Sequence, residues 1–169
     1  MAVISDFGIR ASVRNTKASD LTTAADVLDF VRGVHLESGT GAGQADKVFH
    51  DQRTLAASAS EDLDLAGVLT DVYGAAITFA KVKFIAISAA AGNTNDVLVG
   101  AASATQFVGL LNAAGVITLR PGATFAAMSG AADATGMAVT AGTGDLLQIE
   151  NSAGSTSVTY DIVIVGTSA

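Results

Sequence analysis

The sequence predicts a mainly β protein built as an antiparallel β-sandwich, preceded by an N-terminal arm and one short α-helix. Short β-rich runs, separated by Gly and small polar residues, follow one another through most of the chain, and no long helical pattern lies between them. Such spacing argues for an antiparallel sandwich or barrel rather than for βαβ units. Two runs, 77–88 and 158–165, become apolar on both faces, as central strands of a covered sheet do. We therefore expect these two strands to pair at the centre of the sandwich.

The run 77–88 contains a break in its alternation. Apolar side chains occupy odd positions at its start and even positions from residue 82 on, so the period of two slips by one near Ala80. Such a slip predicts a β-bulge or a bend. Lys81 and Lys83 mark the part of the strand that we expect to be exposed. Two solvated lysines are the favoured interpretation, and contact with an acidic neighbour is the alternative.

The N-terminal part of the chain is predicted to lie outside the sandwich. Residues 1–16 alternate weakly, which predicts an arm or an edge strand. Within 19–32, apolar residues recur at spacings of three or four, which predicts an α-helix with Ser19 as its N-cap and Gly33 at its C′ position. The helix would pack on the sandwich or, alternatively, dock onto a neighbouring subunit. Its apolar positions are Leu21, Ala24, Ala25, Leu28 and Val31.

The glycine-rich segment 33–45 is predicted to be a flexible linker. Its glycines superficially resemble a phosphate-binding loop, but no strand directly precedes it, no helix directly follows it, and it lacks the Gly-Lys-Ser or Gly-Lys-Thr signature. The predicted organisation is therefore an arm, a helix and a linker over residues 1–44, followed by a sandwich domain over residues 45–169.

The remaining strands are predicted from alternation and from the turn residues between them. Residues 61–65 alternate acids with two leucines, which would point inward, and 93–96 is a turn rich in Asn and Asp. The only proline, Pro121, also falls in a predicted turn, where its missing N–H does no harm. The predicted strands are 47–57, 61–65, 97–101, 106–111, 116–120, 124–128, 137–140, 146–150 and 158–165.

Composition excludes several classes of protein. Of the 169 residues, half are hydrophobic and 15% are charged, which is too apolar for a disordered chain. The longest uncharged apolar stretch, 84–91, is far shorter than the roughly 20 residues that span a bilayer, and the N-terminus lacks the pattern of a signal peptide. The absence of Cys excludes disulfides and thiol chemistry. The net charge of −7 disfavours nucleic-acid binding. So few charges are unusual for a free monomer, and they predict contacts with other subunits.

No catalytic, cofactor-binding or metal-binding residue is predicted. The chain contains two histidines, His35 and His50. A nucleophile–base–acid set could be assembled on paper from His50, Asp51 and either Ser58 or Ser60, but no local signature such as Gly-x-Ser-x-Gly supports it. Surface histidines are therefore the favoured interpretation, and we expect the chain not to be an enzyme.

Two groups of oxygen-bearing side chains could in principle bind a hard cation. Neither group matches the spacing of a calcium loop with its terminal bidentate Glu. The favoured interpretation is a solvated strand face for the first group and a turn for the second. The groups are Glu61, Asp62 and Asp64, and Asn93, Asn95 and Asp96. Cleavage of glycans is disfavoured because the chain has no Trp and only two Tyr to serve as sugar platforms.

The order of several short motifs resembles small structural proteins of tailed bacteriophages and related gene-transfer particles. Those chains carry a Leu-x-Leu strand, a Phe-x-x-Val-Lys strand, an Asn-rich turn, an Arg-Pro-Gly turn and a closing Tyr-x-Ile-x-Ile-x-Gly strand. The corresponding segments here are 63–67, 79–85, 93–97, 120–122 and 160–166. The resemblance covers about residues 47–166 and leaves the N-terminal arm outside.

The resemblance implies a non-enzymatic structural component of a phage-like particle. A capsid decoration (cement) protein or a minor capsid protein is the first expectation, with a jelly-roll-like sandwich, a homotrimeric state, and the major capsid protein or other virion subunits as partners. The expected location is the virion, after synthesis in the host cytoplasm, with no cofactor, nucleic acid or membrane involved. A head–tail or tail protein, and a carbohydrate- or receptor-binding sandwich, are the alternatives. Residues 1–44 are expected to contact the shell or a neighbouring subunit.

Overall fold

The computed structural model describes residues 2–100, 102 and 104–169, and within them the protein is mainly β, with antiparallel sheets and no helix. The mainly β, antiparallel prediction is therefore confirmed. The strands are β1 (Ser5–Ala18), β2 (Thr23–Ser38), β3 (Gln44–Ala45), β4 (Lys47–Leu55), β5 (Ser60–Asp64), β6 (Lys81–Ala89), β7 (Val97–Gly100), β8 (Val116–Leu119), β9 (Thr124–Met128), β10 (Met137–Ala138), β11 (Leu146–Asn151) and β12 (Val158–Thr167).

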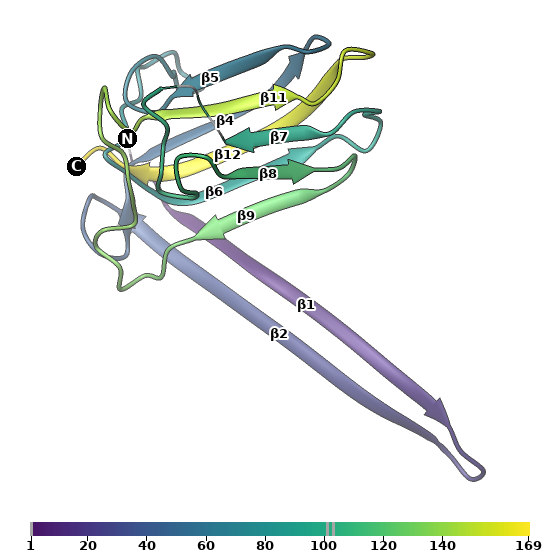
Figure 1. Ribbon diagram of the computed structural model, residues 1–169. Coiled ribbons are helices and arrows are strands. Elements are labelled where there is room, and N and C mark those ends of the chain that lie inside the picture. The colour runs from purple at the N-terminus through teal and green to yellow at the C-terminus, as the bar shows by residue number, and fades with distance from the viewer. Residues whose placement is uncertain (1, 101, 103) are drawn as a thin grey trace.

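Two sheets form the body of the molecule. One has the order β4-β12-β6, with β9 and β10 both pairing with the far edge of β6, and the other has the order β5-β11-β7-β8. The chain crosses from one sheet to the other at most connections, so consecutive strands seldom pair. A single hydrophobic cluster draws buried side chains from both sheets, and Figure 1 shows the two sheets layered over each other. The core of the body therefore lies between the sheets.

The two predicted central strands are neighbours. β6 and β12 pair antiparallel from Tyr160 opposite Ala89 to Thr167 opposite Lys81, so this part of the prediction is confirmed. The ladder shifts between Val165 and Gly166 and leaves Lys83 without an opposite residue. The slip in the sequence pattern is thus a bulge in β6, three residues after Ala80. Residues 77–80 precede β6 and do not belong to a strand.

Gly166 opposite this bulge fits because it has no side chain. A Cβ at that position would lie 2.1 Å from the carbonyl oxygen of Lys81 and 2.8 Å from the ring of Phe79. Real Cβ atoms do not approach backbone so closely, and a glycine in a strand often marks such a close approach. The close approach of β12 to the start of β6 therefore depends on this glycine.

The predicted helix over 19–32 is wrong, because these residues form the tip and the second strand of a long β-hairpin. β1 and β2 pair over 14 residues each, from Ser5 opposite Leu36 to Ala18 opposite Thr23. Ser19, the predicted N-cap, instead closes the hairpin turn: its backbone N–H and its Oγ both donate to the carbonyl oxygen of Thr22. We call this hairpin, residues 5–38, the arm.

The predicted linker is shorter than expected. β2 continues through Gly33 to Ser38, and a turn then leads into β3, which pairs in parallel with the end of β2. Gly33 is not a helix C′ residue but a strand residue opposite Gly8.

Two further expectations are corrected. Residues 106–111 do not form a strand and contribute one isolated bridge between Gln106 and Leu146. Lys83, expected on an exposed face, is only 1% exposed, and its Nζ donates to the backbone carbonyl of Asp133 at 2.5 Å. The other predicted strands are present with shifts of a few residues at their ends, and Ala101, the predicted end of β7, lies outside the described residues.

Candidate functional site

The arm is the most distinctive surface of the protein, because it extends away from the body as a two-stranded ribbon (Figure 1). With a rise of about 3.4 Å per residue, a strand of 14 residues is roughly 48 Å long. Every residue from Gly8 to Gly33 is exposed. The tip residue Leu21 is 99% exposed.

The ribbon has one apolar face. Residues opposite each other in an antiparallel ladder lie on the same face, and alternate residues along a strand lie on opposite faces. The register therefore gathers most of the larger apolar side chains of the arm on one side. Arg32, opposite Ile9, lies on this same side, with its guanidinium 4.5 Å from the centroid of the Phe30 ring, and toward the tip the side becomes polar at Asn15, Lys17 and Asp26. We call the apolar set on this side the apolar face: Phe7, Ile9, Ala11 and Val13 of β1 with Leu28, Phe30 and Val34 of β2.

The opposite side of the ribbon is more polar. It carries Asp6, Arg10, Ser12, Arg14 and Thr16 of β1 opposite His35, Val31, Asp29, Val27 and Ala25 of β2. An exposed ion pair joins Arg10 and Asp29 at 3.6 Å. We call this side the polar face.

The two long edges of the ribbon carry opposite charges. β1 holds three bases, Arg10, Arg14 and Lys17, against one acid near the body, whereas β2 holds three acids against Arg32 alone. Within the described part of the chain, β1 has no neighbour on its outer edge, and β2 has one only at its last two residues, where it meets β3. Each edge thus offers free backbone N–H and C=O groups to another strand.

The base of the arm is fixed on the outer surface of the β4-β12-β6 sheet. The rings of Phe7 and Phe84 stack with centroids 4.4 Å apart, and Leu36 and Val165 are buried in the same small cluster. This cluster is separate from the main core and contains the apolar face only up to Phe7 and Val34. The apolar face therefore begins under cover at the body and continues into solvent.

His35 lies at the base of the arm, between the carboxylates of Asp6 and Glu37. Its Nδ1 lies 2.7 Å from Asp6 Oδ1 and its Nε2 lies 3.1 Å from Glu37 Oε1. The hydrogen bond with Asp6, followed by that with Glu37, raises the pKa of His35 above its usual value. All three side chains are exposed, so this cluster lies on the surface of the arm.

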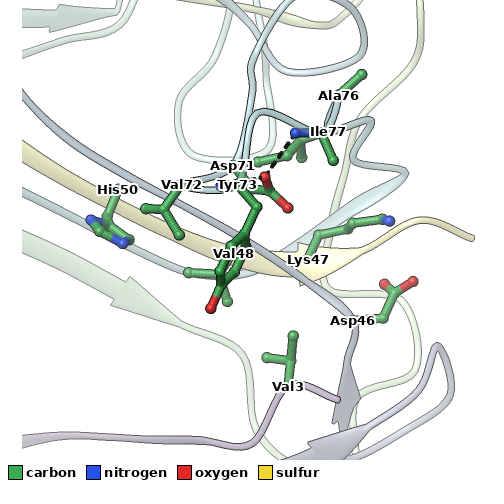
Figure 2. A pocket seen from close by; sticks show the side chains of 11 residues that line it. Val3, Asp46, Lys47, Val48, His50, Asp71, Val72, Tyr73, Ala76 and Ile77 are labelled. Carbon is green, nitrogen blue, oxygen red and sulfur yellow. Dashed lines mark hydrogen bonds between the residues drawn. The ribbon is translucent and has the colours of Figure 1, made fainter. Parts of the chain in front are cut away.

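A shallow pocket of about 270 Å³ lies beside the arm base, between β4 and the loop 71–77. Figure 2 shows Val72 and Tyr73 reaching from this loop toward Val48 and His50 of β4. The Asp71 carboxylate accepts hydrogen bonds from the backbone N–H groups of Tyr73 and Ala75, both at 2.9 Å, and thereby shapes the loop. Tyr73 remains 76% exposed. The pocket is smaller than most ligand sites, which begin at about 300 Å³.

The histidine of this pocket does not form the triad considered from sequence. His50 and Asp51 are adjacent in β4, and adjacent strand residues point to opposite faces. Asp51 accepts a hydrogen bond from Arg53 Nε at 3.0 Å instead. Ser58 lies in a turn where its backbone has a positive φ of 55°, and Ser60 begins β5. No hydrogen bond joins any of these serines to His50 among the described residues.

The first acidic group considered from sequence takes part in structural hydrogen bonds. Glu61 accepts from Arg53 Nη1 at 2.5 Å and from the hydroxyl of Tyr160 at 2.8 Å, so it links β4, β5 and β12. Burial and the bond to Glu61 raise the pKa of Tyr160 far above its usual value. Asp62 accepts from Gln148 and Asp64 from the backbone of Ala66.

The Asn-rich turn is tied to the C-terminal part of the chain. Asn95 Nδ2 lies within hydrogen-bonding distance of three acceptors: Asn151 Oδ1 at 2.9 Å, the Ala153 carbonyl at 3.2 Å and the Thr156 carbonyl at 2.9 Å. Its Oδ1 accepts from Ser155 Oγ. These contacts tie the Asn95 side chain, which is 7% exposed, to the loop that follows β11.

The described residues contain no group of three His, Asp or Glu side chains arranged to hold a metal ion. Within that same part of the chain, no helix is long and apolar enough to cross a membrane. Comparisons with protein-family models, with curated proteins and with solved structures gave no match.

The sequence predicted an arm over residues 1–16 and a helix over 19–32, not the single hairpin that these two segments form. Residues 1–44 were expected to make the contact with other subunits, yet the apolar face arises only when β1 and β2 pair in register. The signal available in the sequence was the density of β-branched and aromatic residues in 27–34, together with two stretches of similar length on either side of Ser19-Asp20-Leu21-Thr22.

Proposed function

We propose that this chain is a non-enzymatic structural component of a phage-like particle, a capsid decoration (cement) or minor capsid protein that stabilises the shell through subunit contacts. The arm is the observation that carries the proposal. An isolated two-stranded hairpin is at best marginally stable in water, and natural proteins seldom leave long strand edges uncovered. An arm of this length, exposed on both faces and both edges, is therefore suited to be covered in an assembly.

The proposed fold of the body is a β-sandwich of the jelly-roll type. The strand orders β4-β12-β6-β9 and β5-β11-β7-β8 support it. A jelly roll consists of eight strands in two sheets linked by two Greek keys, and it is the architecture of many viral capsid domains. With β10 left aside, the chain supplies eight strands with that alternation between sheets.

The charge distribution of the body agrees with a role in assembly. The segment after Lys83 carries five acids and only one base, Arg120, among 86 residues. A surface with so few charges lowers the cost of bringing subunits together, because few ions must be desolvated.

The arm can be removed without disturbing its base, which gives a direct test. Deleting residues 9–32 joins Gly8 to Gly33, which already lie opposite each other. Gly-Gly is a preferred two-residue hairpin turn, so Phe7 and Val34 keep their pairing and their contacts with the body. A longer deletion that also removed Phe7 and Val34 would expose the small cluster around Leu36 and Val165. A loss of particle binding could then result from a loss of folding.

The experiment compares the full chain with the 9–32 deletion in cells that produce the particle, followed by density-gradient banding and immunoblotting. The full chain should band with the particles, and the deletion variant should remain folded by circular dichroism but stay in the soluble fraction. A full chain that never bands with particles would contradict the proposal, as would a deletion variant that bands equally well.

A further inference from the structure

We propose that Gly8 and Gly33 form a hinge between the arm and the body, and that the arm swings at this hinge toward its polar face. These two residues are the only glycines of the arm, and the register places them directly opposite each other. The inference goes beyond the proposed function, because it concerns the motion of the arm and not the identity of its partner.

The glycine pair lies where the anchored part of the arm ends. The register pair before it, Phe7 opposite Val34, belongs to the small cluster on the outer surface of the sheet. From Gly8 to Gly33 every residue is exposed, and none of them belongs to a buried cluster of the described residues. Figure 1 shows β1 and β2 leaving the body with no other strand beside them. The body therefore holds the arm up to Phe7 and Val34, and the two glycines follow at once.

The straight course of the arm does not require a glycine at position 33. A Cβ there would meet only the carbonyl oxygen of Phe7, at an ordinary distance of 3.8 Å, and the ladder passes through this position without a shift of register. Gly33 is also not among the glycines with a positive φ. A glycine inside a strand weakens it, because the backbone keeps access to more conformations, and it often marks a bend. The freedom that Gly33 brings is thus available for bending.

The polar face leaves room for the swing. The glycine pair belongs by register to this face, which therefore carries no side chain between the register pair of Asp6 and that of Arg10. An open hollow of about 570 Å³ at this height is lined only by residues of the arm. At the base, His35 lies between two acids, Asp6 and Glu37, so the face is negative there. A tilt toward this face brings Arg10 nearer to these acids, which is favourable for opposite charges.

The apolar side opposes a swing in the other direction. There Ile9 follows Phe7 on the same side of β1, and the ring of Phe7 is already stacked on Phe84 of the body with centroids 4.4 Å apart. A tilt toward this side would press Ile9 against a stack that has little free space. The swing is therefore directed to the polar face.

A small angle at the hinge gives a large displacement at the tip. From Gly8 to Ala18 the strand rises about 34 Å, so a tilt of about 15° moves the tip by about 9 Å. The arm can then keep a contact at its tip while the body takes more than one orientation. This use rests on the proposed role of the arm in assembly, whereas the hinge itself does not.

Distances between spin labels measure the swing, and a chain without Cys accepts labels at chosen positions. Double electron–electron resonance compares two label pairs that share an exposed label at the tip, Thr22→Cys. The first pair adds Thr118→Cys on β8 and spans the hinge, and the second adds Ser12→Cys on β1 and lies wholly within the arm. An excess of unlabelled chain removes the contribution of labels on different copies. The first pair should give a distance distribution at least about twice as wide as the second.

The Gly33→Val variant tests whether the glycine provides the hinge. Valine suits an exposed strand and restricts its conformation, and position 33 has room for it. Position 8 has not, because a Cβ there would lie 2.9 Å from the carbonyl oxygen of Arg32. Gly33→Val should narrow the distribution of the first pair about twofold and leave the second unchanged. Ala25→Val, at an exposed position of the polar face beyond the hinge, is the matched control and should leave both unchanged.

The wild type alone can overturn the inference, if its first pair is no wider than its second. The inference also fails if Gly33→Val, shown by circular dichroism to be folded, leaves the first pair unchanged, or if Ala25→Val narrows it as much. Narrowing by Gly33→Val alone, in a chain that never bands with particles, would contradict only the proposed function. An unchanged first pair, in a chain that bands with particles, would contradict only the hinge.

Discussion

The hydroxyl of Tyr160 offers the sharpest test of how the body is held together. Tyr160 is fully buried, with 0% exposure, and its O–H donates to the Glu61 carboxylate at 2.8 Å. Tyr160→Phe removes this donor without creating a large cavity, and Glu61 keeps its contact with Arg53. The second tyrosine of the chain, Tyr73, is largely exposed, so Tyr73→Phe is a matched control with the same chemical change.

The expected loss follows from the type of hydrogen bond. Hydrogen bonds to charged groups contribute about 1.5–3 kcal/mol, so Tyr160→Phe should lower the free energy of unfolding by about 2 kcal/mol. For a chain of this size that corresponds to a fall in Tm of about 4–8 °C. Tyr73→Phe should change the free energy of unfolding by less than about 0.5 kcal/mol. Urea denaturation followed by circular dichroism measures both.

The same residue predicts a dependence on pH. The pKa of Tyr160 is raised in the folded state, first by burial and then by the bond to Glu61. The unfolded chain therefore releases this proton at a lower pH than the folded chain, and the associated stability is complete below about pH 10 and lost as the pH rises above it. Tyr160→Phe should make the alkaline decline in stability less steep. Equal stability of the wild type and the variant at pH 8, or identical alkaline slopes, would refute this reasoning.

Two other positions give predictions with internal controls. Asn95→Ala should lower the free energy of unfolding by about 2–3 kcal/mol, because it removes the hydrogen bonds of a side chain that is 7% exposed, one of them to the buried Asn151, whereas the exposed Asn15→Ala should have little effect on denaturation by urea. Gly166→Ala should be destabilising by more than about 2 kcal/mol, because the added Cβ meets the backbone of Lys81. Gly92, where a Cβ meets no atom within 4 Å, is the control, and thermal denaturation showing equal Tm values for both glycine variants would contradict the close approach of β12 to Lys81.

The centre of the body was predictable from sequence because local and global preferences agree there. The two runs around Ile85 and Ile162 are apolar on both faces, and only a covered central strand accommodates such a pattern. The slip in alternation was also visible, but its position was not. Lys83 was placed outside because lysine is normally exposed, and the fact that its Nζ finds the Asp133 carbonyl depends on a loop 50 residues away in sequence.

The arm was misassigned because its pairing is not a local property. Leu21, Leu28 and Val31 fall at helical spacing, and Ser19 with Gly33 mimics helix caps. In the ribbon, β2 carries apolar residues on both faces, Val27 and Val31 on one and Leu28 and Phe30 on the other, which hides the period of two. The second strand forms because β1 supplies a complementary edge over its full length. The sequence of β1 alone shows only a weak alternation, which does not predict this pairing.

The regular ladder of the arm also determines how its length can change. Each residue added to both β1 and β2 extends the ribbon by about 3.4 Å, but an odd insertion moves every later side chain to the other face. Only insertions or deletions of two residues in each strand preserve the apolar face between residues 7 and 34. The length of the arm can therefore change only in steps of about 7 Å if the apolar face is to be kept. Variants with longer or shorter arms should differ from this chain by multiples of four residues, two in each strand.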